Sequence, residues 1–161
     1  GQIGVSVYEP LEALGALKIK GLEVIQIPTN LIDKRFIKNG FLSKAAKAKK
    51  TVLVRSVFLQ GLFFKKTVPA RLKAFKPYQE KIKKTCLEYN LSVHELALRY
   101  VLSLKGVSSA LIGLENLKQI KENIAAINRG PLDKKMMSII NKMRSAPVKI
   151  IDPRLWPRAI K

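Results

Sequence analysis

The stretch ALIGLENLKQIKEN, residues 110–123, combines an apolar run, a glycine and the start of a helical pattern. The first amides of a helix lack intrahelical partners, so a strand, a glycine turn and a helix start can together hold an anion or a nucleotide. The same arrangement reverses the chain in many α/β proteins without binding anything. On its own, the turn at Gly113 leaves both a binding role and a purely structural role open.

Residues that could build a metal centre or a catalytic triad are scarce in this chain. It has one cysteine, Cys86, and one histidine, His94, so an internal disulfide is excluded. A histidine-based metal site or a Ser-His-Asp triad could be built only around His94. We interpret His94 as an ordinary, partly exposed helical side chain. The sequence predicts no metal site, and the single thiol fits a reducing cytoplasm.

The net charge of +20, from 31 Lys and Arg against 11 Asp and Glu, is large enough to attract any polyanion. The basic residues are spread over nearly every segment, however, and aromatic residues make up only 7% of the chain. A nucleic-acid-binding stripe is concentrated and interleaved with stacking aromatics. We therefore expect no specific nucleic-acid partner, and we keep a basic nucleic-acid-binding protein as the less favoured alternative.

Short β-branched runs alternate with helical patterns along the chain. Strands are predicted at residues 1–7, 21–28, 51–58 and 107–113, and helices at 9–19, 40–50, 78–89, 92–104, 116–127 and 133–143. Residues 59–77 are predicted as a glycine-containing loop and residues 145–161 as an irregular, Pro-rich tail. No apolar tract is long enough to cross a bilayer, so we expect no membrane partner. Because parallel strands need crossover connections, four successive βα units predict a parallel sheet.

Two α/β architectures fit four βα units. One is an open doubly wound domain, and the other is half of a (β/α)₈ barrel, whose usual length of about 250 residues exceeds this chain. The chain opens at Gly1 directly inside a predicted strand, and its first methionine is Met136. These features favour the half barrel and predict that a segment upstream of Gly1 is missing.

Four segments resemble, in order and spacing, the second half of the aldo-keto reductases, which are NAD(P)H-dependent (β/α)₈ barrels: IGVSVY, EVIQIPTNLIDKR, VLVRSVFLQGLF and LALRYVLSLKGVSSALIGLENLKQIKENI. The last is the most specific, since family members read roughly Leu-Ala-Leu-x-Trp/Tyr-Val-Leu, then Gly-Val, an apolar strand, Gly and Gln-x-x-Glu-Asn. The resemblance implies that residues 1–161 form the C-terminal half of the barrel. The predicted strands would be strands five to eight of a TIM-type (β/α)₈ barrel whose N-terminal half is missing from this chain.

The resemblance also implies a binding site for NADP(H) or NAD(H). Ser6 and Gln26 match the residues that hold the nicotinamide carboxamide, although Val7 replaces a common asparagine. Arg55 stands where many members place an aromatic ring against the nicotinamide, and a guanidinium plane can also stack. The pyrophosphate loop corresponds to Ser56, Leu59 and Gly61, and the adenosine-binding segment to Gly113, Leu114, Glu115, Gln119, Glu122 and Asn123. Strand-end hydrogen bonds or a solvated helix face would equally account for individual residues of this set.

Catalysis in the family depends on a tyrosine that supplies a proton, assisted by lysine and often by histidine and aspartate. All four belong to the first half of the barrel, so this chain carries none of them, and Tyr8, Tyr78, Tyr89 and Tyr100 lie outside the family's tyrosine motif. The resemblance implies reduction of an aldehyde or ketone, a small-molecule carbonyl substrate, by the complete enzyme and inactivity of the fragment alone. The alternative is a non-catalytic binding or regulatory barrel protein. Substrate, cofactor preference and oligomeric state stay open.

Two further expectations concern packing. We assign Met136, Met137 and Trp156 to packing, with Trp156 as a minor candidate for the wall of a substrate pocket. Half a barrel exposes strand edges and an apolar interior face, both of which favour aggregation. The isolated chain is therefore expected to be poorly stable or to self-associate.

Overall fold

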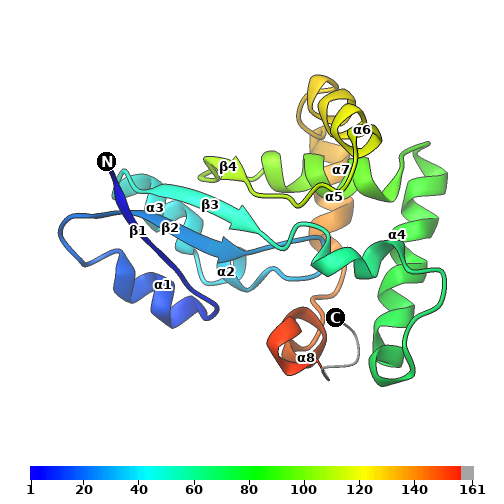
Figure 1. Cartoon of the computed structure of the whole chain (residues 1–161), viewed down its shortest axis with the longest axis horizontal. Helices are drawn as coiled ribbons and strands as arrows, with labels where there is room; N and C mark the ends of the chain where they lie inside the picture. Colours follow the sequence, from blue (N-terminus) through cyan, green and yellow to red (C-terminus); the bar gives the residue numbers. More distant parts are fainter. Residues whose placement is uncertain (157–161) are drawn as a thin grey trace.

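The computed structural model describes residues 1–156 and shows an α/β fold built on one parallel sheet (Figure 1). The strands lie in chain order β1-β2-β3-β4, and every neighbouring pair is parallel. They are β1 (Ile3–Ser6), β2 (Leu22–Pro28), β3 (Thr51–Arg55) and β4 (Ser109–Ala110). A doubly wound sheet reverses its strand order at a switch point, whereas a (β/α)₈ barrel keeps chain order throughout. The observed order is consistent with part of such a barrel.

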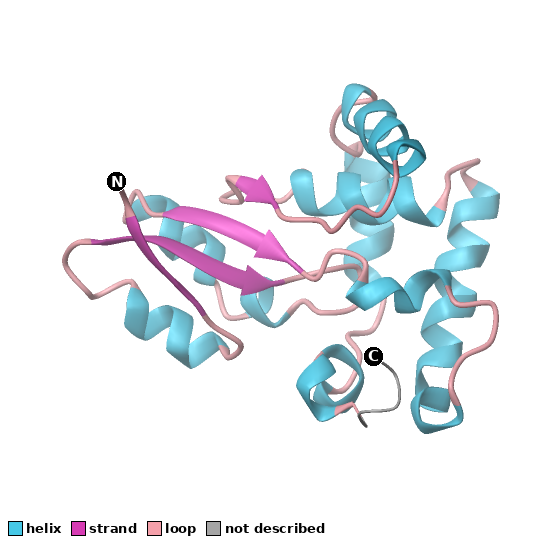
Figure 2. Ribbon diagram, in the orientation of Figure 1, coloured by secondary structure: helices cyan, strands magenta, loops and turns pink. Residues whose placement is uncertain are grey.

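Helices cover the sheet and extend beyond the ends of its strands (Figure 2). In Figure 1, α1 and α3 lie beside the strands on the left, while α4 to α7 gather on the right, toward which the arrowheads of β2 and β3 point. The α-helices are α1 (Pro10–Ala16), α2 (Arg35–Lys38), α3 (Phe41–Lys47), α4 (Lys76–Glu88), α5 (Val93–Leu102), α6 (Leu117–Asn128), α7 (Lys134–Lys142) and α8 (Val148–Ile151). The 3₁₀ helices are η1 (Leu59–Phe64), η2 (Ala70–Phe75) and η3 (Pro153–Leu155).

The helices near the strand ends begin at side chains suited to capping. Ser92 precedes α5 and accepts a hydrogen bond from the Glu95 amide at 3.0 Å. Asn116 precedes α6 and accepts from the Gln119 amide at 3.0 Å. A side-chain oxygen at this position satisfies one of the orphan amides of the first turn, so each cap fixes where its helix starts.

The hydrophobic core lies between the sheet and the helices that cover it. Ile25 and Ile27 of β2 and Val52 and Val54 of β3 have no solvent exposure. They alternate with half-exposed residues on β3, as the period of two in a strand requires. Trp156 is buried and donates from Nε1 to the Ile150 carbonyl oxygen at 3.0 Å, which agrees with a packing role.

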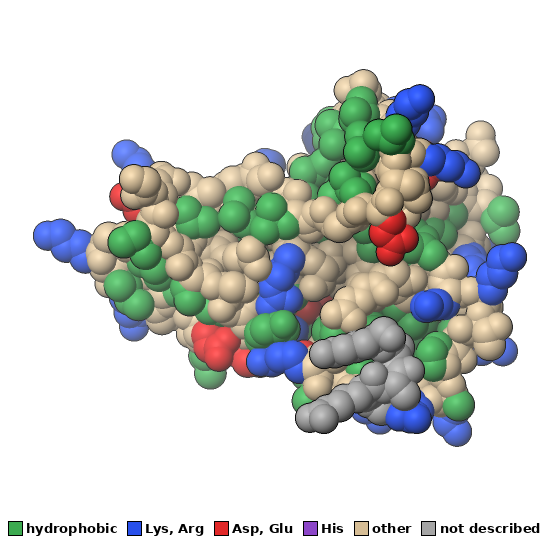
Figure 3. Space-filling model, viewed as in Figure 1, with side chains coloured by type: hydrophobic (Ala, Val, Ile, Leu, Met, Phe, Trp, Pro, Cys, Tyr) green, Lys and Arg blue, Asp and Glu red, His purple; other side chains and the backbone are tan. Residues whose placement is uncertain are grey.

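Two apolar surfaces remain uncovered by the described residues. Strand β1 is exposed along its whole length, and 69% of the Ile3 surface is accessible. Helix α6 carries exposed apolar side chains at helical spacing, namely Leu117, Ile120, Ile124 and Ile127. Hydrophobic side chains are visible on the surface over β1 and over α6 in Figure 3. Apolar patches of this kind mark places where another surface packs.

Four segments differ from what the sequence predicts. Strand β3 ends at Arg55 instead of residue 58, because Ser56 adopts a left-handed backbone with a φ of 61°. Residues 59–77 contain η1 and η2, and α2 was not expected. The prediction of an irregular tail is wrong for residues 145–156, where α8 and η3 form. Its remaining part, residues 157–161, lies outside the described residues. No helix of residues 1–156 has both the length and the apolar character needed to cross a membrane.

Candidate functional site

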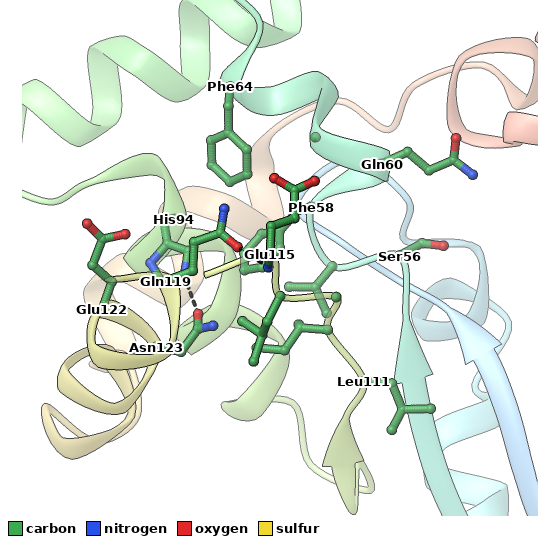
Figure 4. A pocket seen from close by; sticks show the side chains of 15 residues that line it. Ser56, Phe58, Gln60, Phe64, His94, Leu111, Glu115, Gln119, Glu122 and Asn123 are labelled. Carbon is green, nitrogen blue, oxygen red and sulfur yellow. Dashed lines mark hydrogen bonds between the residues drawn. The ribbon is translucent and has the colours of Figure 1, made fainter. Parts of the chain in front are cut away.

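A cavity of about 810 Å³ lies beyond the carboxyl ends of β3 and β4 (Figure 4). The loop after β3 forms one wall, the turn between β4 and α6 together with the first two turns of α6 forms the opposite wall, and the first turn of α5 forms the floor. Among the described lining residues, Glu115, Glu122 and His94 are ionisable, and none is Lys or Arg. The full lining is Ser56, Val57, Phe58, Gln60, Gly61, Phe64, His94, Leu111, Ile112, Gly113, Leu114, Glu115, Gln119, Glu122 and Asn123.

The loop after β3 is built from left-handed residues. Ser56, Leu59, Gln60 and Gly61 all have φ between 48° and 76°. Tight turns close this loop, since the Leu59 amide donates to the Ser56 carbonyl at 3.0 Å and the Gly61 amide to Phe58 at 3.0 Å. Non-glycine residues rarely adopt this conformation and tend to do so at functional sites. Ser56, Gln60 and Gly61 line the cavity, while the Leu59 side chain is fully buried in the core.

The opposite wall is the turn between β4 and α6. Gly113 lines the cavity, and a Cβ added there would meet no atom within 4 Å. The Gln119 side chain folds back over the turn, and its Oε1 accepts from the Glu115 amide at 2.8 Å. Together with the Asn116 cap, this hydrogen bond means that side chains of the turn and of α6 already accept from two of their backbone amides. The helix start is therefore not a bare set of amides, which a short anion-binding turn would need.

His94 forms the floor between the two walls (Figure 4). Its Nε2 makes a hydrogen bond with Oδ1 of Asn123 on α6. Its ring stacks on Phe58 with centroids 5.0 Å apart at 30°, and Phe64 lies 6.5 Å away at 40°. Asn123 is only 4% exposed, and its Nδ2 finds no hydrogen-bond partner among the described residues.

A second polar group lies where β1, β2 and β3 end. Ser6 pairs in register with Gln26, and its hydroxyl donates to Gln26 Oε1 at 3.0 Å. Arg55 reaches Ser6 Oγ from Nε at 3.4 Å and donates to the Val7 carbonyl at 3.2 Å. The Arg55 guanidinium carbon lies 3.9 Å from the centre of the Tyr8 ring. Arg55 also donates to the Ser56 hydroxyl at 3.3 Å, which links this group to the cavity loop.

Buried polar residues after β2 hold this end of the sheet in place. Asn30 has no solvent exposure; its Nδ2 donates to the Ser56 carbonyl at 3.1 Å, and its Oδ1 accepts from the Asp33 amide at 2.9 Å. Lys34 is 2% exposed, and its ammonium donates to the carbonyl oxygens of Ile140 and Met143 at the end of α7. Burial, with a contribution from Lys38, lowers the pKa of Lys34 to about 8.

Comparison with known families accounts for most of the chain. The sequence profile of the Aldo/keto reductase family matches residues 1–145. The chain belongs to the aldo-keto reductase family. A comparison with curated protein sequences finds no match.

Solved aldo-keto reductases share its fold. AKR11C1 from Bacillus halodurans in its holo form is 23% identical with a TM-score of 0.75, covering 91% of this chain and 51% of that one. The apo form of the same enzyme gives 23% identity and a TM-score of 0.76 over 91% and 52%. A thermostable aldo-keto reductase in complex with the inhibitor epalrestat gives 16% identity and a TM-score of 0.63 over 87% and 47%. The chain spans about half the length of these structures, and at these identities the comparison shows a shared fold.

The residues predicted to bind a cofactor fall into the two polar regions of this aldo-keto reductase chain. Those that line the cavity are Ser56, Gly61, Gly113, Leu114, Glu115, Gln119, Glu122 and Asn123. Ser6, Gln26 and Arg55 form the group at the strand ends. Leu59 is buried in the core and is not among the described residues that line the cavity. The expected stack of Arg55 on a nicotinamide stays a prediction, since its partner here is Tyr8. The cofactor role of the whole set also stays a prediction.

Sequence reasoning missed several residues that shape the site. His94, Phe58 and Phe64 form its aromatic floor, and Asn30 anchors Ser56. Phe58 and Phe64 each lie three residues from Gly61 in the sequence. This spacing alone does not predict that both rings face the cavity, because that depends on the conformation of the loop. Cys86 is buried, and burial raises the pKa of its thiol to about 11. Residues 1–156 contain no cluster of three His, Cys, Asp or Glu suited to a metal ion.

Proposed function

We propose that this chain is the nucleotide-binding half of an aldo-keto reductase that uses NADH or NADPH to reduce an aldehyde or ketone. One observation carries the proposal. The cavity joins the left-handed loop that begins at Ser56 to the turn and helix that end at Asn123, at the carboxyl ends of two adjacent parallel strands. Barrel enzymes of this architecture build their sites from the loops at that end.

The residues present fit a dinucleotide. A volume of about 810 Å³ is within the range of about 300–1,000 Å³ that small-molecule sites occupy. The buried Nδ2 of Asn123 has no partner in the described chain, and so it is available to an acceptor on a ligand. The left-handed backbone of the loop suits close approach of a phosphate to main-chain amides.

Each part of the cofactor has residues that would hold it. Ser6 and Gln26 would bind the carboxamide, because a hydroxyl and an amide can both donate and accept. The backbone around Ser56 and Gly61 would bind the pyrophosphate, and the wall ending at Asn123 would bind the adenosine. When bound, the nicotinamide supplies a hydride to a carbonyl carbon. The chain's own task would be to orient that ring and to exclude water from it.

We place the four strands as strands five to eight of the barrel, with the tyrosine, lysine, histidine and aspartate of catalysis on the other half. The exposed β1 edge and the apolar stripe of α6 support this placement, because they lie on the first and last units of the chain, where the remaining barrel units would pack. The complete enzyme is proposed to be cytoplasmic and to act on a small carbonyl compound. A binding or regulatory barrel without chemistry would keep the cavity but lack those four residues.

Binding of NADH and NADPH to the 161-residue chain, measured by calorimetry, tests the proposal. Gly113→Trp should fill the cavity, because open space surrounds the position, and should weaken binding at least about tenfold, the equivalent of about 1.4 kcal/mol. Gly15→Trp is the matched control, because Gly15 also has open space around it and lies on α1, outside the cavity lining. Absence of binding to the unaltered chain, or equal loss in both variants, would overturn the proposal. Aldehyde reduction by the protein that includes the other half separates an enzyme from a regulatory barrel.

A further inference from the structure

We propose that His94 is a positioning residue that fixes the orientation of the Asn123 amide and so determines what the cavity recognises. In this arrangement His94 Nε2–H donates to Asn123 Oδ1, and Asn123 Nδ2 is presented to the ligand as a donor. The ligand must then offer an acceptor, such as a ring nitrogen of a heteroaromatic base. This inference rests on the proposed function, since it assigns the base end of the dinucleotide to this wall.

The hydrogen bond between the two side chains is the first support. His94 lies in the first turn of α5 and Asn123 near the middle of α6, and these helices pack against each other. Asn123 Oδ1 faces the imidazole, while Nδ2 is buried without a partner in the described chain. A buried amide donor left unpaired is unfavourable, so a site with this geometry is completed by an acceptor from outside.

The packing of the imidazole is the second support. Phe58 stacks on the ring, and Phe64 lies against it at a tilt. Both phenylalanines come from the loop after β3 and line the same cavity (Figure 4). They limit rotation of the imidazole, so Nε2 stays directed at Asn123. The same rings provide an aromatic surface on which a planar base can stack.

The tautomer of His94 determines which atom of the Asn123 amide remains available to a ligand. With the proton on Nε2, the asparagine oxygen is occupied and Nδ2 remains free to donate. With the proton on Nδ1, Nε2 would accept from Nδ2, and the free Oδ1 would select a ligand that donates. Glu115 and Glu122 are the other ionisable groups among the described lining residues, and both offer acceptors only when ionised. The other donor on that wall, Gln119 Nε2, belongs to an amide whose Oε1 is held by the Glu115 amide at the exposed turn, so Asn123 Nδ2 is the buried donor that the wall presents to a ligand.

Two measurements test the proposal. The first uses ¹⁵N NMR of the imidazole in the 161-residue chain without ligand, where we expect the Nε2–H tautomer. The second uses calorimetry with ADP-ribose on three variants. His94→Phe keeps a ring but loses the donor, Asn123→Asp keeps the shape but replaces Nδ2 by oxygen, and His94→Gln restores a donor. We expect the first two to weaken binding about tenfold, one hydrogen bond of about 1.4 kcal/mol, and the third to recover most of it.

The outcomes separate this inference from the proposed function. ADP-ribose that fails to bind the unaltered chain overturns both. Binding that His94→Phe leaves unchanged, or an Nδ1–H tautomer, overturns the inference alone. A double variant of His94→Phe with Asn123→Asp should lose little more than either single variant, because the two residues act as one unit. Fully additive losses would show independent roles and also overturn the inference. If His94→Phe does not fold, the tautomer and the Asn123→Asp affinity still decide it.

Discussion

Gln60 offers a direct test of the strained loop that lines the cavity. It has φ of 50° and ψ of 38°, and its side chain is exposed and makes no hydrogen bond in the described structure. A non-glycine residue in this region costs about 1–2 kcal/mol, whereas glycine adopts it freely. Glycine gives back about 0.5–1 kcal/mol through its larger freedom in the unfolded chain. Gln60→Gly should thus raise the free energy of unfolding by about 0.5–1 kcal/mol, equivalent to about 2 °C in Tm at this chain length.

Thermal and urea unfolding followed by circular dichroism measure this change. Lys49→Gly is the matched control, because Lys49 has φ of 54° at the end of α3, is exposed and lies outside the cavity lining. It should stabilise the chain by a similar amount. Gln60→Gly should also retain ADP-ribose affinity, because the loop keeps its shape, while the β-branched Gln60→Val should lower both stability and affinity. If Gln60→Gly destabilises the chain while Lys49→Gly stabilises it, the loop is not left-handed at Gln60 and the reasoning is refuted.

Four other predictions follow from features already described. Glu115→Arg in the complete enzyme should shift the ratio of kcat/KM with NADPH to kcat/KM with NADH toward NADPH by about tenfold or more. The reason is that a carboxylate repels a 2′-phosphate and no Lys or Arg is among the described lining residues. An unchanged ratio would mean that Glu115 is not at the 2′ position. Between pH 7 and 9, unfolding free energies should rise by about 1 kcal/mol more for the unaltered chain than for Lys34→Met. The pKa of Lys34 is about 8 in the folded chain and 10.5 in the unfolded chain, so the folded state is destabilised by the buried charge below pH 8. This destabilisation is lost as the pH rises from 8 toward 10.5. Parallel plots of unfolding free energy against pH for the two proteins would contradict this. Sedimentation of the folded chain should show self-association through the exposed β1 surface, and a monomer at every concentration tested would count against it. The chain should bind duplex DNA weakly and without sequence preference, and the complex should dissociate as the salt concentration rises from about 50 to 200 mM. A sequence-selective footprint at about 0.2 M salt would favour a nucleic-acid-binding protein over an enzyme.

The strands and most helices could be predicted because their signals are local. The β-branched run of β2 predicted residues 21–28, and the structure has Leu22–Pro28. Strand β4 was predicted at 107–113 but has two ladder residues, since β3 is its one neighbour and ends at Arg55. Pairing depends on the partner strand, which a local pattern does not contain.

The candidate site divides in the same way. Ser56 and Gly113 lie around one cavity, as residues that follow adjacent strands should, and Asn123 joins them from α6; the resemblance had already singled out all three. His94 was interpreted as an ordinary helical side chain. Its role in the cavity could not be predicted, because its neighbours Phe58 and Asn123 come from distant parts of the chain. The burial of Lys34 could not be predicted from the sequence, because the carbonyl oxygens that accept its hydrogen bonds belong to Ile140 and Met143, more than a hundred residues away.

The cavity is encoded by one continuous part of the chain. Every described lining residue falls between Ser56 and Asn123, so the whole lining comes from the segments that follow β3 and β4. A stretch of this kind can be inherited as a block. Exchange of the corresponding gene segment between two related barrels would transfer every described lining residue together with the floor. From outside this segment, Asn30 contributes the hydrogen bond that holds Ser56 in place. Recognition of the pyrophosphate and adenosine could in this way evolve separately from the nicotinamide contacts of Ser6 and Gln26 and from the part of the barrel that performs the chemistry.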